Sequence, residues 1–288
     1  MSELRLGGRS FGDHQTLVMA IINRTPDSFY DRGATRDDSP ALDRLDQVVA
    51  EGADIVDIGG VKAAPGVEID IAEEVRRVAG FVATARDRYP DIIISVDTYR
   101  SEVARAVSAE GADVLNDAWG GWDPAVAEVA AEKGLGLVCT HAGGLAPRTR
   151  PHRVHYRDVT ADVVSRTVRE AERAAALGVP RDSIMIDPGH DFGKNTRQSL
   201  VVTRNLADMV DTDWPVLMSL SNKDFVGETL AVPLGERLVG TLATTAISAW
   251  LGARVFRVHE VLQTRQTLDM VAAIAGTSEP RVAVRGLA

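Results

Sequence analysis

Apolar runs of strand length alternate with longer amphipathic segments along almost the whole chain, and this alternation constrains the fold more than any single motif. A repeated order of strand and helix is typical of βαβ units, which bring their strands together in a parallel sheet. The pattern predicts strands at Leu17–Asn23, Asp54–Gly60, Ile92–Thr98, Val114–Trp119, Leu135–His141, Ile184–Gly189, Val216–Ser221 and Val255–His259.

Helical periodicity fills the intervals between these runs. Gly52, Gly111 and Gly178 each stand between a helical segment and a strand, where glycine adopts the left-handed conformation at little cost. A doubly wound sheet is the alternative arrangement, but no GxGxxG sequence follows the first strand. We therefore predict an α/β fold, a single-domain (β/α)8 TIM barrel. Its helices would include Ala72–Arg88, Ser101–Glu110, Ala125–Lys133, Val159–Leu177 and Arg237–Leu251.

The length of 288 residues suits one such barrel, and no linker or low-complexity segment divides the chain. We expect an N-terminal segment at residues 1–15, the barrel at 16–278 and a C-terminal tail at 279–288. The net charge of −9 argues against nucleic-acid binding, and the longest apolar runs are too short to span a membrane. Because Cys139 is the only cysteine, no intrachain disulfide can form, and we expect a cytoplasmic protein.

Polar side chains stand at the end of every predicted strand. In a TIM barrel the carboxyl ends of the strands carry the chemistry. Asp and Asn are depleted from strands, so turn formation alone explains eight polar ends poorly. The sequence therefore predicts a functional rim of Asn23, Asp57, Asp97, Asn116 with Asp117, His141, Asp187, Ser221 with Lys223, and Arg257 with His259.

The residue types divide this rim into two chemistries. Lys223, Arg257 and His259 end the last two strands, where barrels often bind phosphate. For Asp57 we favour a structural role, as a buried salt bridge or a cap, that orders neighbouring loops. The remaining acceptors and amides suit the donor edge of a flat heterocycle in a pocket of low dielectric, and they are Asp97, Asn116 and Asp187.

A long loop at residues 23–33 follows the first predicted strand. It is rich in turn-forming residues, as is typical of a mobile lid over a barrel site. Asn23 at its start offers an oxygen ligand to Mg²⁺, a hard cation that proteins often share with substrate phosphates.

Seven segments resemble the signatures of the dihydropteroate synthase family. They occur in the family's order, and the resemblance covers nearly the whole chain from about residue 16. The segments are VMAIINRTPDSFYDRG (18–33), GADIVDIGGVKAAP (52–65), SVDTYRSEVARA (95–106), GADVLNDAWGG (111–121), IDPGHDFGK (186–194), SLSNKDFVGETL (219–230) and FRVHEV (256–261).

The resemblance implies a barrel that joins 6-hydroxymethyl-7,8-dihydropterin pyrophosphate to p-aminobenzoate and releases pyrophosphate. It implies Mg²⁺ as a cofactor, held by Asn23, and a homodimer, because family members are commonly dimers. Lys223, Asp97 and Arg257 would be catalytic, through positioning and stabilisation of the leaving group. The implied substrate-binding residues are Asn23, Asp97, Asn116, Asp187, Ser221, Lys223, Arg257 and His259.

The same segments depart from the family pattern around the second substrate. Where the family typically reads Gly-Gly-Glu-Ser-Thr-Arg-Pro-Gly, residues 59–66 read Gly-Gly-Val-Lys-Ala-Ala-Pro-Gly. This change removes a hydroxyl and a guanidinium from the place where a carboxylate should dock, and a lysine does not replace the directional contact of an arginine. Other departures are Thr140 and Ala142 for methionine, Asp191 for glycine and Asn222 for arginine.

The loop at residues 146–158 is basic in an otherwise acidic protein. Its sequence, APRTRPHRVHYRD, contains four arginines and two histidines. One interpretation is a solvated loop paired with nearby acids. The other is a site that receives an anionic group on a different or larger acceptor.

These observations predict a dihydropteroate synthase homologue with a retained pterin-pyrophosphate pocket, an altered p-aminobenzoate site and weak or absent synthase activity. Three alternatives stay open. The chain could be an active dihydropteroate synthase of folate biosynthesis, it could transfer a pterin to an unknown anionic acceptor, or it could be a non-catalytic pterin- or anion-binding protein. Whether it is an enzyme is therefore left to experiment.

Overall fold

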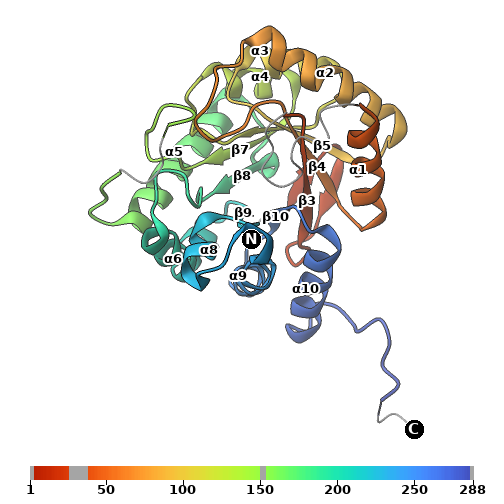
Figure 1. Ribbon diagram of the computed structural model, residues 1–288, viewed down its shortest axis with the longest axis vertical. Coiled ribbons are helices and arrows are strands. Elements are labelled where there is room, and N and C mark those ends of the chain that lie inside the picture. Colours follow the sequence, from red (N-terminus) through yellow and green to blue (C-terminus); the bar gives the residue numbers. More distant parts are fainter. Residues whose placement is uncertain (1–2, 26–37, 150–153, 286–288) are drawn as a thin grey trace.

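Eight parallel strands form the centre of the molecule and curl into a nearly closed barrel (Figure 1). The computed structural model describes residues 3–25, 38–149 and 154–285. The strands follow the order β8-β7-β6-β5-β4-β3-β10-β9, and a bridge between Ile186 and Val216 joins the two ends of the sheet. Their bounds are β3 Leu17–Asn23, β4 Ile55–Gly59, β5 Ile93–Asp97, β6 Val114–Asp117, β7 Gly136–Thr140, β8 Ile184–Asp187, β9 Leu217–Ser219 and β10 Val255–Val258.

Helices surround the strands, as Figure 1 shows. Asp70 and Asp158 cap the first turns of two of them, and Gly178 ends one in the left-handed conformation. The helices are α1 Asp38–Ala50, α2 Ile71–Arg88, α3 Ser101–Ala109, α4 Ala125–Lys133, α5 Val159–Leu177, α6 Thr196–Arg204, α7 Ala207–Val210, α8 Asp224–Leu230, α9 Leu238–Trp250 and α10 Val261–Ile274. Together with the closed sheet they confirm the predicted (β/α)8 barrel.

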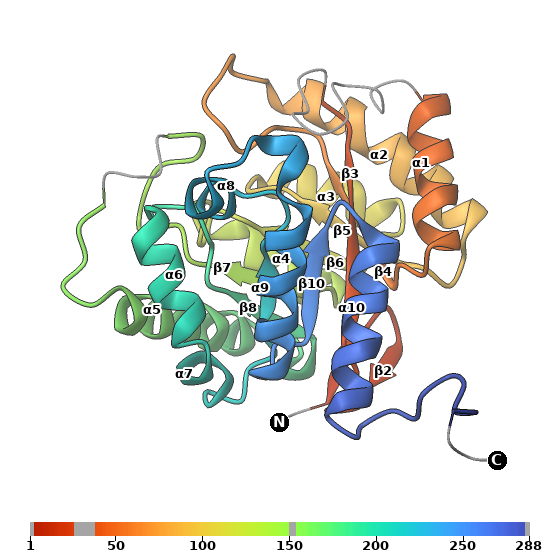
Figure 2. The ribbon, with the colours of Figure 1, turned by 60° about the horizontal axis from the view of Figure 1, so that its bottom comes forward.

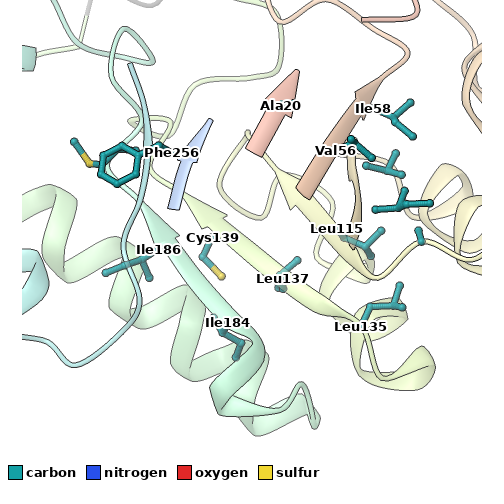
Figure 3. Packing of buried hydrophobic residues seen from close by; sticks show 14 of the residues in the cluster. Ala20, Val56, Ile58, Leu115, Leu135, Leu137, Cys139, Ile184, Ile186 and Phe256 are labelled. Carbon is teal, nitrogen blue, oxygen red and sulfur yellow. The ribbon is translucent and has the colours of Figure 1, made fainter. Parts of the chain in front are cut away.

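Alternate residues of each strand face opposite sides of the barrel wall, because side chains on a strand have a period of two. The outward set packs under the helices as the larger apolar cluster, and Figure 3 shows Leu115, Leu137 and Ile184 of that cluster on neighbouring strands. The inward set begins with an apolar layer, which includes Met19, Ile55, Ile93, Val114 and Met185. Two residues further along, the same inward rows become polar on every strand except β3, where the polar residue is Asn23 at the strand end, and these rows build the site.

A β-hairpin closes the other end of the barrel. It consists of β1 Leu4–Leu6 and β2 Arg9–Phe11, and in Figure 2 it lies at the lower end, away from the loops that follow the barrel strands. Leu4, Leu6 and Phe11 are buried in the same cluster as the inward apolar layer. The hairpin therefore contributes to the core on which the site rests.

The predicted strands are all present, and none of their ends is displaced by more than two residues. The structure adds the hairpin and the helices α1, α6, α7, α8 and α10 to the named elements. Most of the predicted lid lies outside the described residues, because residues 26–37 are not among them. No described helix is both long and apolar enough to cross a membrane.

Candidate functional site

A cavity of about 480 Å³ lies at the carboxyl ends of the barrel strands. Its volume suits a small organic ligand. The inward rows of the strands deliver their polar residues to this one space, as the period of two requires. The cavity wall contains every residue that the sequence predicts for substrate binding, namely Asn23, Asp97, Asn116, Asp187, Ser221, Lys223, Arg257 and His259.

Arg257 on β10 holds two carboxylates across the barrel. Its Nε lies 2.6 Å from Oδ2 of Asp57, and its Nη2 lies 2.9 Å from Oδ2 of Asp97. Asp57 is fully buried and also accepts hydrogen bonds from Ser95 Oγ at 2.6 Å and Asn116 Nδ2 at 3.2 Å. The predicted buried salt bridge of Asp57 is thus confirmed, and it fixes the positions of Arg257 and Asn116.

Asp97 on β5 carries a carboxyl that changes its charge near neutral pH. Burial raises the pKa of Asp97 to about 7, and the charges of Asp57 and Glu74 add to the rise against the opposing effect of Arg257. Near neutral pH the carboxyl therefore exists in both its protonated and its charged form. The charged form can accept a hydrogen bond from a ring N–H of a ligand.

Asp187 and Lys223 stand on the next part of the wall. Asp187 accepts hydrogen bonds from the backbone N–H of Gly189 at 2.6 Å and from Ser219 Oγ at 2.8 Å, so its carboxylate is fixed in orientation. The Lys223 ammonium donates to the carbonyl oxygen of His190. Burial lowers the pKa of Lys223. The neighbouring carboxylates oppose this shift and favour the charged ammonium.

Ser221 and His259 form a hydrogen-bonded pair at the ends of β9 and β10. Ser221 Oγ lies 2.9 Å from Nδ1 of His259 and 3.1 Å from Oε2 of Glu260. Burial, together with the charge of Arg257, lowers the pKa of His259 to about 3, so its imidazole is neutral at neutral pH. An anion bound here would meet a neutral hydrogen-bonding group in His259 and a positive charge in Arg257.

The loop after β4 presents the altered family sequence to the cavity. A Cβ atom on Gly60 would lie 2.8 Å from Cγ1 of Val78, so the close approach of α2 requires glycine at this position. Arg77 on α2 donates to the carbonyl oxygen of Gly60 at 3.0 Å. The loop is thereby fixed at its base, and its next four residues, Val61, Lys62, Ala63 and Ala64, line the cavity.

Arg148 from the basic loop holds the far side of the same segment. It donates hydrogen bonds to the carbonyl oxygens of Ala64 at 3.3 Å and of Val67 at 2.6 Å. Its guanidinium therefore supports the backbone of the loop after β4. Residues 150–153 of the basic loop lie outside the described part of the chain, so the predicted acceptor site there stays a prediction.

An apolar wall separates this loop from Lys223. The ring of Phe192 meets Trp119 edge to face, with 5.1 Å between the ring centroids. Ala63 packs against the same small cluster. On its other side Phe192 lies 4.9 Å from the ammonium of Lys223, a cation–π contact. Trp119 is buried and packs in this wall.

Two acidic side chains complete the outer end of the cavity. Asp191 adopts a left-handed backbone conformation with φ of 65°. Its Oδ2 accepts a hydrogen bond from the backbone N–H of Asp224 at 2.6 Å, and both residues line the cavity. Burial raises the pKa of Asp191, while Lys223 opposes that rise.

Asp117 and His141 belong to the predicted rim but face away from the cavity, because they stand on the outward rows of β6 and β7. Asp117 accepts hydrogen bonds from the backbone of Trp119 and Gly121 at 2.9 and 2.7 Å and so shapes the loop after β6. Nε2 of His141 lies 2.7 Å from Oδ1 of Asp162 on α5. These two residues order loops around the site.

Lys194 is a buried residue to which the sequence assigns no role in the site. Only 2% of its surface is exposed, and its ammonium lies 2.7 Å from Nδ1 of His141. It donates to the carbonyl oxygens of Gly189 at 3.0 Å and Phe192 at 2.9 Å, and burial lowers its pKa well below the usual value. Lys194 thus fixes the segment that carries Asp191 and Phe192.

Oxygen ligands for a metal are few in this part of the structure. The described residues contain no group of three or more His, Cys, Asp or Glu side chains arranged to hold a metal ion. Asn23 stands in the cavity wall, while Asp57 and Asp97 are engaged by Arg257. A Mg²⁺ ion would therefore need phosphate oxygens of a ligand in addition to Asn23.

The sequence profile of a family described as pterin binding enzyme matches residues 19–259. This chain belongs to the pterin-binding enzymes. The chain is 57% identical over 287 residues to a Mycobacterium leprae protein named inactive dihydropteroate synthase 2, and the match covers 98% of this chain and 99% of the relative. It is 35% identical over 263 residues to the dihydropteroate synthase of Escherichia coli strain K12, with 91% and 93% of the two chains covered.

Solved structures of the same family have the same fold as this chain. The Yersinia pestis dihydropteroate synthase, solved in complex with a sulfonamide drug, superposes with a TM-score of 0.90 at 30% sequence identity. The superposition covers 96% of this chain and 100% of the other. The segments that resemble dihydropteroate synthase signatures therefore reflect membership of that family, as predicted.

Proposed function

We propose that this chain binds a pterin pyrophosphate in the barrel cavity and couples it weakly, or not at all, to p-aminobenzoate. One contrast within the cavity carries this proposal. The eight residues predicted for the pterin and the pyrophosphate share the wall, whereas the loop after β4 presents Val61, Lys62, Ala63 and Ala64 to the same space. The higher identity to a relative named inactive than to the Escherichia coli synthase supports the same conclusion.

The residue roles follow from the contacts within the cavity. Asp97, Asn116 and Asp187 would take the donor edge of the pterin ring, since two of them offer carboxyl oxygens and the third an amide. Lys223 and Arg257 would supply positive charge to the ring substituents and the pyrophosphate. Ser221 and neutral His259 would add hydrogen bonds, and a positively charged, preorganised wall of this kind could assist departure of pyrophosphate.

Mg²⁺ is proposed to enter with the ligand. Asn23 would give it one side-chain oxygen, and the pyrophosphate would give it others, because Mg²⁺ commonly combines few protein oxygens with substrate phosphates and water. The bound ion would neutralise part of the pyrophosphate charge. In that arrangement Arg257 keeps its ion pairs with Asp57 and Asp97 and fixes these side chains at the inner end of the cavity.

A two-part assay tests the proposed function. Calorimetry with 6-hydroxymethyl-7,8-dihydropterin pyrophosphate, with and without Mg²⁺, measures the first binding step. Pyrophosphate release after addition of p-aminobenzoate measures turnover, with the Escherichia coli synthase as the positive control. We expect binding, and turnover at least about a hundredfold below the control, as is usual when oriented transition-state contacts are lost.

Turnover equal to that of the control would instead identify an active dihydropteroate synthase. Absence of binding would reject the pterin pocket itself. Binding without any detectable release is the result expected of a non-catalytic pterin-binding protein or of an enzyme with another acceptor. For such an acceptor, an anionic group near loop 146–158 remains our proposal, because the described part of that loop adjoins the cavity through Arg148 and Ala64.

We also propose that the chain forms a homodimer through α9 and α10. These two helices lie side by side and carry several large apolar side chains that are exposed in the single chain. Trp250 is 62% exposed and Ile274 is 63% exposed, and a second copy of the same face would cover them. The other members of this apolar face are Val239, Ile247, Leu262 and Met270. We place the protein in the cytoplasm, since its one cysteine, Cys139, is buried in β7 and unpaired.

A further inference from the structure

Asp191 holds a backbone conformation that side chains with a Cβ atom rarely adopt. Its φ of 65° lies in the left-handed region, which favours glycine and, among other residues, Asn and Asp. The carboxylate of Asp191 compensates for this by accepting hydrogen bonds from the first backbone N–H groups of α8, those of Asp224 and Phe225. The side chain is therefore fixed at the outer end of the cavity and does not point freely into solvent.

The cations that line the cavity near Asp191 are Lys62, Lys223 and Arg237, and each of them has other interactions. Arg237 lines the same end, but its Nη1 donates to Oδ1 of Asp224 at 2.9 Å and to the carbonyl oxygen of Asn222 at 2.7 Å. Lys223 faces both Asp191 and the inner Asp187, which share its positive charge. A ligand group at this end would thus meet the negative charge of Asp191 beside cations that already have partners.

Apolar side chains make up the rest of this outer space. Phe192, next to Asp191, presents its ring between Trp119 and Lys223. Val61, Ala63, Ala64 and Leu234 line the same cavity, together with the cationic Lys62. A planar ring would make apolar contacts here, whereas a carboxylate on that ring would be repelled by the carboxylate of Asp191.

We propose that Asp191 selects against an anionic second ligand, so that the outer part of the cavity takes an uncharged or positively charged aromatic amine in place of an aromatic carboxylate. This inference rests on the proposed function, in which the inner part of the cavity holds a pterin pyrophosphate. The larger acceptor considered for loop 146–158 remains compatible with it, because that acceptor's anionic group would lie outside the cavity.

The expected size of the selection follows from Coulomb's law. Two carboxylates about 6 Å apart, in surroundings with an effective dielectric constant of about 20, disfavour binding by about a hundredfold. Solvent at the cavity mouth reduces this value, so we expect a difference of about tenfold or more between an anionic ring and its neutral isostere.

Three ring probes of nearly the same shape measure the effect. p-Aminobenzoate, p-aminobenzamide and p-aminobenzamidine carry a negative charge, no charge and a positive charge, respectively. Their affinities for the full-length protein are measured by calorimetry, both with saturating pterin pyrophosphate and Mg²⁺ and with the protein alone. We expect the benzamide and the benzamidine to bind about tenfold or more tightly than the benzoate.

Two substitutions separate the charge of Asp191 from the space it fills. Asp191→Asn keeps an acceptor for the backbone of α8 and tolerates the left-handed conformation, but removes the charge. Asp191→Gly also removes the side chain. In both variants we expect the benzoate to gain about tenfold in affinity relative to the benzamide. Asp213→Gly is the matched control, since Asp213 has φ of 63° and does not line the cavity.

The outcomes separate this inference from the proposed function. Equal binding of the benzoate and the benzamide to the unaltered protein would overturn the inference, as would an unchanged ratio in both Asp191 variants. Failure of all three probes to bind would also overturn it. Failure of the pterin pyrophosphate alone counts against the proposed function, while the series with the protein alone still reports the charge preference.

Discussion

Asp97 is the side chain whose charge state most directly links the cavity to pH. Its carboxyl lies in the cavity wall, and burial raises its pKa to about 7. The Asp97 carboxyl is therefore mostly protonated below this pH and mostly charged above it. The charged form is the one that accepts hydrogen bonds from a ring N–H.

We predict that affinity for the pterin pyrophosphate rises as the pH increases from about 5.5 to about 8, and then levels off. Below the pKa of Asp97, binding must displace the carboxyl proton. Calorimetry in buffers of different ionisation enthalpy should therefore detect proton release at about pH 6 that vanishes by about pH 8. In Asp97→Asn the release should disappear, and its persistence in that variant would assign the proton to another group.

The positions of the cavity residues were predictable from the sequence because strand ends and the period of two are local properties. Asp97, Asn116 and Asp187 stand on inward rows of strands whose ends the apolar pattern already marks. Lys194 was not predictable in the same way. Its burial depends on carbonyl groups of Gly189 and Phe192, which turn toward one point only in the folded loop.

Among the elements, the N-terminal hairpin closes one end of the barrel with only two short strands. Its two strands join through Gly7 and Gly8, both with positive φ, as a tight two-residue turn requires. The sequence contains this turn signal, but strands of three residues are too short for their pattern to stand out. The hairpin packs against the inward apolar layer of the barrel strands. Local sequence does not indicate this long-range contact.

We predict that Leu4→Ala lowers the free energy of unfolding by about 3 kcal/mol, because it leaves a cavity in the inner apolar cluster. Leu4 is fully buried there. Urea denaturation followed by circular dichroism measures the change. Arg5→Ala in the same strand is the control, since the Arg5 side chain is 53% exposed, and we expect it to change stability by less than about 0.5 kcal/mol. Equal effects of the two substitutions would contradict the sealing role of the hairpin.

At the scale of the whole molecule, one outer face of the barrel carries exposed apolar side chains. The apolar face of α9 and α10 lies on helices that contribute no residue to the cavity wall. Its large side chains gain free energy when a second copy covers them, at about 25 cal/mol for each Å² of apolar surface removed from water. A dimer formed there would leave the cavity mouth open to ligands.

We predict that the protein sediments as a dimer of its 30.9 kDa chain, and that Trp250→Glu combined with Ile274→Glu yields the monomer. Both charges would be buried without partners in the dimer. Sedimentation equilibrium distinguishes the two masses. Trp122→Glu serves as the control, because Trp122 is 54% exposed but lies in the loop after β6. A monomeric unaltered protein, or a dimer that survives the double substitution, would reject this interface.

The hairpin also has a consequence for the order in which the chain folds during synthesis. Leu4 and Leu6 pack with Leu217 and Val255, which are made more than two hundred residues later. Contacts so distant in sequence form late and slowly. The hairpin therefore reaches its full set of contacts only after the last barrel strand, β10, has emerged.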